Sequence, residues 1–123
     1  GEPMDTPKIF ESEHRFCQIL WEREPVSSTE LVRLCREKLG WKKSTTYTVI
    51  KRLSERGVVR LENAVVTSLV SREQVQTSES REIVDRAFGG SLPRFVAAFT
   101  SGKALTAQEA AEIRRLIDQY EEV

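Results

Sequence analysis

The sequence predicts a mainly α-helical fold with a small β-hairpin, and two observations support this fold class. Apolar residues recur at intervals of three and four along most of the chain, which is the period of an amphipathic helix. Between residues 57 and 70, β-branched residues gather instead in two short runs. With 123 residues and a hydrophobic fraction of 39%, the chain has enough apolar side chains for a folded core.

The first two helices are marked by their ends. Residues 13–24 are expected to form a helix that carries Phe16, Cys17, Ile19, Leu20 and Trp21 at helical spacings, and Pro25 stops this helix. Ser27 and Glu30 have the spacing of a capping box, in which each side chain accepts the backbone amide of the other residue. The second helix is expected to bury Leu31, Leu34, Cys35 and Leu39 and to end at Gly40.

A third helix over residues 41–53 has two different faces. Its apolar stripe is formed by Thr46, Val49, Ile50 and Leu53. The opposite face is polar and carries Ser44, Thr45, Tyr47, Thr48, Lys51 and Arg52. These side chains suit a helix that lies in a DNA groove. Considered alone, the same face is equally explained as an ordinary solvated surface.

A hairpin is expected next. Gly57 ends the third helix, and residues 58–61 and 65–70 predict two strands around Glu62-Asn63-Ala64. Three helices followed by such a hairpin predict a winged helix-turn-helix, which we assign to residues 8–70 as a DNA-binding domain.

The distribution of charge supports this assignment, although the formal net charge of the chain is zero. Residues 42–60 contain one acidic residue, Glu55, whereas the segments on either side carry net negative charge. The basic residues of this segment are Lys42, Lys43, Lys51, Arg52, Arg56 and Arg60. A local basic patch on an otherwise neutral chain is typical of DNA docking through one element.

Residues 71–123 predict a three-helix dimerisation module. Ser71 with Gln74 and Thr106 with Glu109 have capping-box spacing, and Gly89-Gly90 breaks the first of the three helices. So few residues cannot close a core alone, so we expect a second copy to cover the apolar faces. The alternative, in which these helices fold back on their own winged helix, stays open. The expected interface residues are Phe88, Leu92, Phe95, Val96, Phe99, Ile113, Leu116, Ile117 and Tyr120.

The sequence does not favour an enzyme, a cofactor or a metal site. His14 is the single histidine, and Cys17 and Cys35 lie among apolar residues, where small buried core residues are the simpler interpretation. No nucleophile, glycine-rich phosphate loop or perturbed acid/base pair is recognisable. The chain also lacks a long apolar run and an N-terminal signal segment, so we expect a cytoplasmic protein without a membrane partner.

Several short motifs occur in a characteristic order. They are Ile19-Leu20-Trp21, Trp41, Ser44-Thr45, Thr48 to Leu53, Gly57, Phe88 to Leu92, Val96 to Phe99 and Leu105 to Glu109. Through them the chain resembles the penicillinase-repressor (BlaI/MecI-type) family of winged-helix regulators, from about Ile9 to Tyr120. The resemblance implies a homodimeric repressor whose winged helix binds a palindromic operator and whose C-terminal helices form the dimer.

The chain departs from the family pattern in ways that affect function. His14 stands where a Trp is usual, and the turn at Glu62-Asn63-Ala64 is short and lacks the basic residues of the family's wing. Regulatory members are inactivated by a protease at an Asn-Phe bond, whereas Ala98-Phe99 stands here, which leaves the induction mechanism and a protease partner open. The C-terminal cysteine cluster of the copper-responsive branch is missing, so metal sensing is not expected.

The functional hypothesis is a homodimeric DNA-binding transcriptional repressor that docks its third helix in the major groove of a pseudo-palindromic operator. Phosphate contacts are expected from Lys42, Lys43, Lys51 and Arg52. Base-edge contacts are expected from Ser44, Thr45, Tyr47 and Thr48. The alternative is a winged-helix protein-interaction module that binds no duplex DNA.

Overall fold

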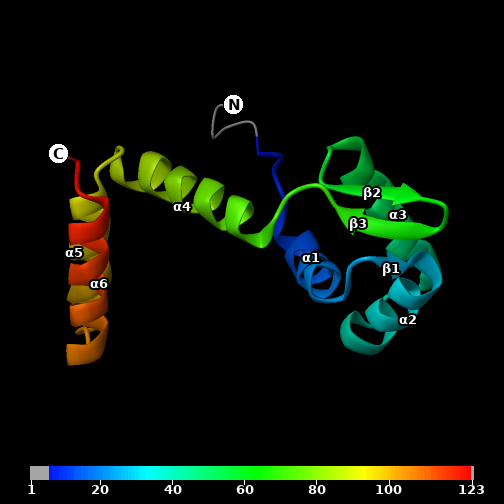
Figure 1. Cartoon of the computed structure of the whole chain (residues 1–123), viewed down its shortest axis with the longest axis horizontal. Helices are drawn as coiled ribbons and strands as arrows, with labels where there is room; N and C mark the ends of the chain where they lie inside the picture. The colour runs from blue at the N-terminus through cyan, green and yellow to red at the C-terminus, as the bar shows by residue number, and fades with distance from the viewer. Residues whose placement is uncertain (1–5, 123) are drawn as a thin grey trace. The chain divides into compact units, whose positions relative to one another are not determined.

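The computed structural model describes residues 6–122, which form two compact units that divide between Ser80 and Arg81. Figure 1 shows the order of the elements. The helices are α1 (Glu11–Arg23), α2 (Ser28–Leu39), α3 (Lys43–Glu55), α4 (Arg72–Phe88), α5 (Leu92–Gly102) and α6 (Ala107–Tyr120). The strands are β1 (Val26–Ser27), β2 (Val59–Glu62) and β3 (Val65–Ser68). The predicted fold class, helical with a small hairpin after the third helix, is confirmed.

Only one of the two hydrogen bonds of the predicted capping box forms at the start of α2. The Ser27 hydroxyl accepts from the Glu30 amide at 3.1 Å, and Gly40 ends the helix with a φ of 71°. The Glu30 carboxylate does not turn back to Ser27. It accepts from the Arg33 guanidinium at 2.8 Å, because a charged donor one turn along the helix makes a stronger hydrogen bond than a neutral amide.

The two predicted capping boxes of the C-terminal segment are both complete. Ser71 and Gln74 exchange hydrogen bonds of 2.8 and 3.0 Å at the start of α4. Thr106 and Glu109 do so at 3.0 Å in each direction at the start of α6. These bonds satisfy amides that a helix start otherwise leaves without partners.

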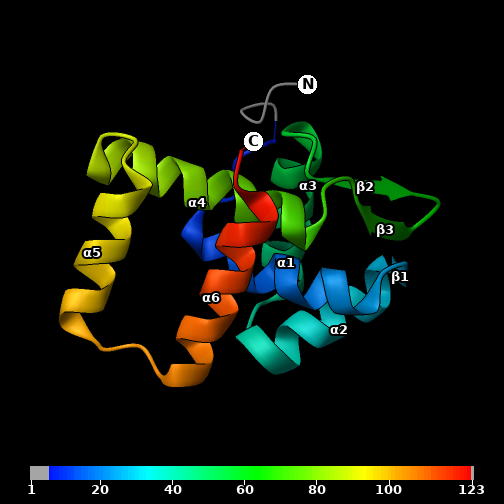
Figure 2. The same cartoon turned by 60° about the vertical axis from the view of Figure 1, so that its left-hand side comes forward.

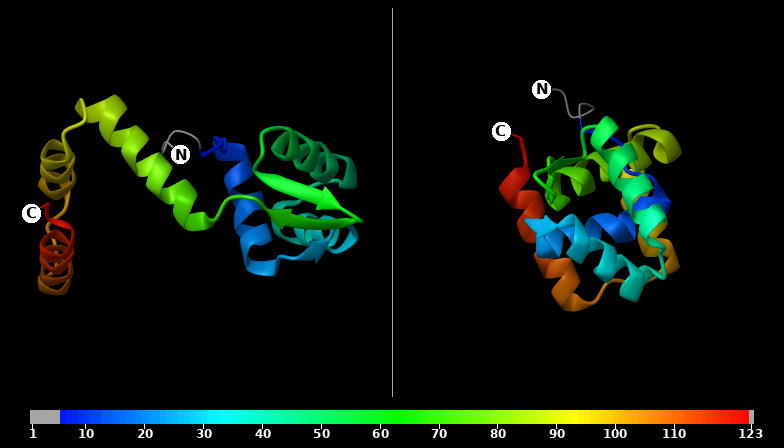
Figure 3. Two further views of the ribbon diagram at one scale, coloured as in Figure 1. Left: turned by 45° about the horizontal axis from the view of Figure 1, so that its top comes forward. Right: turned by 90° about the vertical axis from the view of Figure 1, so that its right-hand side faces the viewer.

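The sheet has three antiparallel strands in the order β1-β3-β2, and Figure 3 (left) shows the longer pair, β2 and β3, as a hairpin. Glu62 pairs with Val65, so the turn consists of two residues, Asn63 and Ala64, both with positive φ. Right-handed strand twist favours such a turn, at the expense of strain in Ala64. Strand β1 was not predicted, because two residues carry no readable periodicity.

The first unit has one hydrophobic core between α1, α2, α3 and the sheet. The largest fully buried apolar side chains are Phe16, Leu20, Leu31, Leu34, Ile50 and Leu53. The predicted stripe of α3 is buried at all four positions, whereas Leu39 is only partly covered. Cys17 and Cys35 are buried core residues as predicted, and burial raises the pKa of the Cys17 thiol to about 12.

Helix α4 contributes to both units. Val75, in its first turn, is buried in the core of the first unit. His14 Nε2 on α1 lies 2.8 Å from the Glu79 carboxylate, so a second contact attaches this part of α4 to α1. The helix continues without a break to Phe88, past the division between the two units.

The second unit leaves its apolar side chains largely uncovered. The Phe88 and Phe95 rings meet edge to face at 5.5 Å, and the Phe95 and Phe99 ring centroids are 6.3 Å apart. No residue of α5 or α6 is buried. In Figure 2, α5 and α6 stand apart and are joined by a loop.

Candidate nucleic-acid interface

The candidate site is the solvent face of α3 together with its N-terminal cap, Lys42. Seven of the eight predicted binding residues are exposed: Lys42, Lys43, Ser44, Thr45, Thr48, Lys51 and Arg52. The apolar stripe on the opposite side holds the helix in the core. The short polar side chains and the lysines are therefore presented outward by a rigid element.

Tyr47 is the exception among the predicted residues. Its side chain is half-buried and packs against the core, and its hydroxyl donates to the Ser28 hydroxyl at 3.1 Å. This bond ties α3 to the first turn of α2, which the sequence did not indicate. A base contact by Tyr47 has to be made by the part of the ring and hydroxyl that stays accessible.

The N-terminal end of α3 is a region of positive potential. Its first turn contains no acidic residue, and Lys42 at the N-cap makes no side-chain cap. Backbone amides at a helix start carry partial positive charge, and Lys42 and Lys43 add two full charges there. The hydroxyls of Ser44 and Thr45 lie in the same turn. This combination of donors suits a phosphate group.

At the other end of α3, a buried carboxylate organises two arginines. Glu13 of α1 is 1% exposed, and its Oε2 accepts from Arg52 Nη2 at 3.1 Å and from Arg56 Nη2. Its Oε1 accepts from the Phe10 amide at 2.9 Å. Burial raises the pKa of Glu13, but the Phe10 amide and the two guanidinium groups outweigh it and leave this pKa below its ordinary value.

The two arginines differ in how much of the guanidinium group stays available. Arg56 also donates to the Lys8 carbonyl at 2.8 Å and stacks 4.7 Å from the Phe10 ring centre, so it is engaged on several sides. Arg52 makes one contact with Glu13, and half of its side chain is exposed. Sequence reasoning missed Glu13, because an acidic residue in a first helical turn is ordinary.

The wing offers fewer cations than α3. Its turn, Asn63-Ala64, carries none, and the Ala64 carbonyl accepts from the Ser28 amide at 2.9 Å, which fixes the hairpin tip against α2. Arg60 on β2 is exposed and is the basic residue of the hairpin. The sequence placed Arg60 in the basic segment without assigning it a role.

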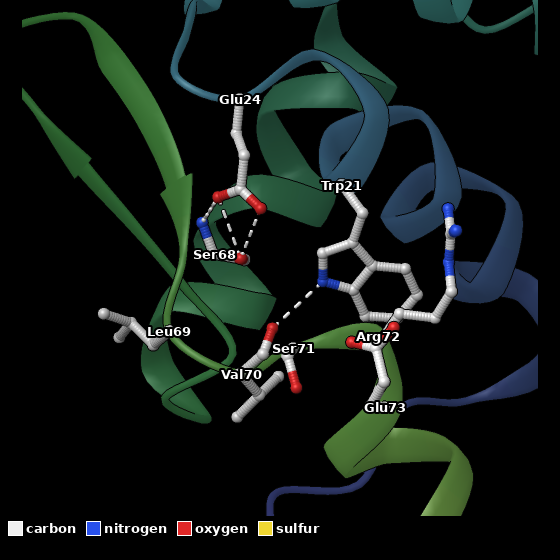
Figure 4. A pocket seen from close by; sticks show the side chains of 8 residues that line it. All are labelled: Trp21, Glu24, Ser68, Leu69, Val70, Ser71, Arg72 and Glu73. Atoms are coloured by element: carbon white, nitrogen blue, oxygen red, sulfur yellow. Dashed lines mark hydrogen bonds between the residues drawn. The ribbon is translucent and has the colours of Figure 1, made fainter.

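A shallow pocket of about 360 Å³ lies where β3 leads into α4 (Figure 4). The Glu24 carboxylate accepts from the Ser68 amide at 2.6 Å and from its hydroxyl, and Trp21 Nε1 donates to the Val70 carbonyl at 3.0 Å. These hydrogen bonds fasten Trp21 of α1, and Glu24 at its C-terminal cap, to this connection. Within residues 6–122 there is no cluster of His, Cys, Asp and Glu able to hold a metal ion, nor a helix long and apolar enough to cross a membrane.

The predicted dimerisation residues form an uncovered apolar surface on the second unit. The most exposed are Leu92, Val96, Phe99, Ile113, Leu116, Ile117 and Tyr120, with exposed fractions from 38% to 75%. Phe88 and Phe95 are half-buried against each other. Ala98 and Phe99 both lie within α5, so the bond between them is helical.

The sequence model of the penicillinase repressor family matches residues 9–119 of the chain. The chain belongs to the penicillinase repressor family. Its relatives include the methicillin resistance regulatory protein MecI of Staphylococcus aureus, which is 22% identical over 93% of this chain and 96% of that protein. The penicillinase repressor of Bacillus licheniformis is 19% identical over 93% of this chain and 92% of that protein.

Family membership makes this protein a transcriptional repressor, as the sequence predicted. The match begins just before α1 and ends one residue before the end of α6, so it covers most of both units.

Proposed function

We propose that this member of the penicillinase repressor family acts as a homodimer and docks α3 of each protomer in the major groove of a pseudo-palindromic DNA operator. The observation that carries the proposal is the two-faced character of α3. All four residues of its apolar stripe are buried, while its hydroxyl and lysine side chains lie outside. A helix of this width and polarity fits the major groove.

The roles of the individual residues follow from their chemistry. Lys42, Lys43 and Lys51 are exposed and contact phosphates, with Arg52 as a fourth cation whose position is set by Glu13. Ser44, Thr45 and Thr48 have short side chains that reach base edges or the thymine methyl group. Tyr47 contributes from the rim of this face, because its hydroxyl is engaged with Ser28.

The second unit supports the homodimer. Its helices α5 and α6 contain no buried residue, although they carry seven exposed large apolar side chains. A cluster of exposed large apolar side chains on neighbouring elements is typical of an interaction surface. A copy related by a two-fold axis presents the same surface and covers both, and two linked winged helices then read two half-sites.

The test begins with selection of a duplex from a random-sequence library by the full-length protein. Binding to the selected duplex and to a scrambled duplex is then measured by fluorescence anisotropy over a series of salt concentrations. We expect log Kd for both to rise with log salt at about 0.9 per neutralised phosphate, and a Lys42→Ala/Lys43→Ala double variant to lower the slope.

A Lys38→Ala variant on α2 is the matched control, since Lys38 is exposed but lies outside the proposed surface. Failure to enrich any duplex, with an affinity that does not change with salt, favours the alternative function of a protein-interaction module. An equal effect of Lys38→Ala and the α3 variant contradicts the assignment of α3 as the docking helix.

Inactivation by a protease at Ala98-Phe99 stays a prediction. Proteases prefer exposed, flexible segments, and this bond lies within α5. Cleavage there requires local unwinding of the helix first. The check is whether the Ala98-Phe99 bond is cut more slowly when the protein is dimeric than after dilution to the monomer.

A further inference from the structure

The cluster of Glu13, Arg52 and Arg56 at the C-terminal end of α3, called here the Glu13 cluster, is not explained by the proposed function. Glu13 is 1% exposed, yet it is charged and belongs to α1, which carries none of the proposed DNA-contacting residues. A buried ion pair gives little net stability compared with apolar packing, because both charges lose their hydration. The buried Glu13 carboxylate is therefore better explained by the fact that it holds the groups it binds in fixed positions.

The position of Arg52 makes that consequence relevant to DNA. Thr45, Thr48 and Arg52 follow each other at intervals of three and four, so they form one stripe along the exposed side of α3. Two of them are candidates for base contacts, and Arg52 is the cation at the C-terminal end of the stripe. Among residues 6–122, its guanidinium is held by Glu13 through Nη2 alone, so within this part of the chain Nε and Nη1 remain free to donate.

We propose that Glu13 is a positioning residue that fixes Arg52 and thereby sets the register in which α3 reads DNA. This inference rests on the proposed function. An unrestrained arginine samples many rotamers and follows whichever phosphate is near, on any sequence. An arginine held at a fixed point reaches a phosphate only when the helix lies at one position along the groove, so a phosphate contact comes to favour one register of the base contacts.

Arg56 serves as an internal comparison. It binds the same carboxylate oxygen, but the Lys8 carbonyl and the Phe10 ring also hold it, and it is only 26% exposed. Loss of Arg56 therefore disturbs the cluster without removing the contact between Glu13 and Arg52. If Glu13 only stabilises the fold, variants of Arg52 and Arg56 should change DNA discrimination to the same extent. If Glu13 positions Arg52, only the Arg52 variants should change it.

The test measures the ratio of affinities for the selected and the scrambled duplex at one salt concentration. We expect Glu13→Gln to lower this ratio by roughly fivefold or more, within the usual range of coupling between residues in contact. The added positive charge strengthens binding to both duplexes, so it cancels in the ratio. In an Arg52→Gln background, Glu13→Gln should leave the ratio unchanged.

Two control variants are matched to this change. Glu37→Gln removes a carboxylate from the exposed pair with Arg33 on α2, and Arg56→Gln removes the second guanidinium of the cluster. Both should keep the wild-type ratio. Arg52→Lys keeps the charge but loses the fixed guanidinium, so it should lower the ratio as Glu13→Gln does. This variant tests the inference even if Glu13→Gln does not fold.

The inference is overturned if Glu13→Gln lowers the ratio equally with and without Arg52, or if Arg52→Lys keeps the wild-type ratio. The inference is also overturned if Arg56→Gln lowers the ratio as much as Glu13→Gln does. Failure of the wild-type protein to bind any duplex overturns the proposed function instead, and that measurement comes first.

Discussion

The proposed dimer interface gives the sharpest quantitative prediction, through Leu116 on α6. Its side chain is 52% exposed in the single chain, so about half of its apolar surface is left for a partner to cover. Complete burial of a leucine side chain contributes about 1.5–3 kcal/mol, so the uncovered half contributes roughly 1 kcal/mol. A two-fold interface contains this residue twice, which gives about 2 kcal/mol for the dimer.

Leu116→Ala is therefore expected to raise the dimer dissociation constant by about 30-fold. Leu116→Asp should do more, because it also places an unpaired charge in the apolar interface. The measurement is sedimentation equilibrium over a range of protein concentrations. Gln119→Ala is the control, since Gln119 lies on α6 outside the stripe of Ile113, Leu116, Ile117 and Tyr120.

Two results refute this reasoning. The first is a wild-type protein that is monomeric at every concentration tested, since the apolar surface then has another explanation. The second is an unchanged dissociation constant for Leu116→Ala in a dimeric protein, which shows that the partner contacts a different face of α6. A loss of similar size in Gln119→Ala points to the same conclusion.

Three further predictions concern the first unit. Because folding lowers the pKa of Glu13, its carboxylate stabilises the protein above the unfolded pKa near 4.5, and this stabilisation is lost as pH falls through the folded pKa. In urea titrations, the free energy of unfolding of Glu13→Gln should therefore fall less steeply with decreasing pH than that of the wild type. Ala64→Gly should raise the free energy of unfolding by about 1 kcal/mol in urea titrations, because glycine adopts the positive φ of this turn without strain, and a destabilised variant contradicts this. Thr48→Ala should reduce discrimination between selected and scrambled duplexes by roughly 1–3 kcal/mol, whereas Lys43→Ala should weaken both by similar factors; equal effects of the two variants show that the base-reading side is misassigned.

Much of the fold was predictable because it is specified locally. The stripe of α3 repeats every three to four residues, and Gly40 marks the end of α2 by its own conformational preference. The face that α3 presents outward follows directly from the face that it buries. Strand β1 was missed because its two residues become a strand only by pairing with β3, about 40 residues further along the chain.

The candidate site was predicted less completely than the fold, for a similar reason. The exposed lysines and hydroxyls of α3 were visible in the helical pattern. The partners behind them were not, since Glu13 and Arg52 are 39 residues apart in sequence and Tyr47 reaches Ser28 across 19 residues. An acidic residue in a first helical turn and a tyrosine on a polar face both have common local explanations, so only the tertiary contacts reveal these roles.

The burial of both cysteines has a practical consequence for chemical labelling. Only the thiolate form reacts rapidly with maleimides and disulfide reagents, and the Cys17 pKa of about 12 leaves almost none of it at neutral pH. Cys35 is equally inaccessible in the core, and burial raises its pKa as well. Fluorophores or spin labels can therefore be attached through a single Gln119→Cys substitution on the wild-type background, and distances across the proposed dimer can be followed without first removing the native thiols.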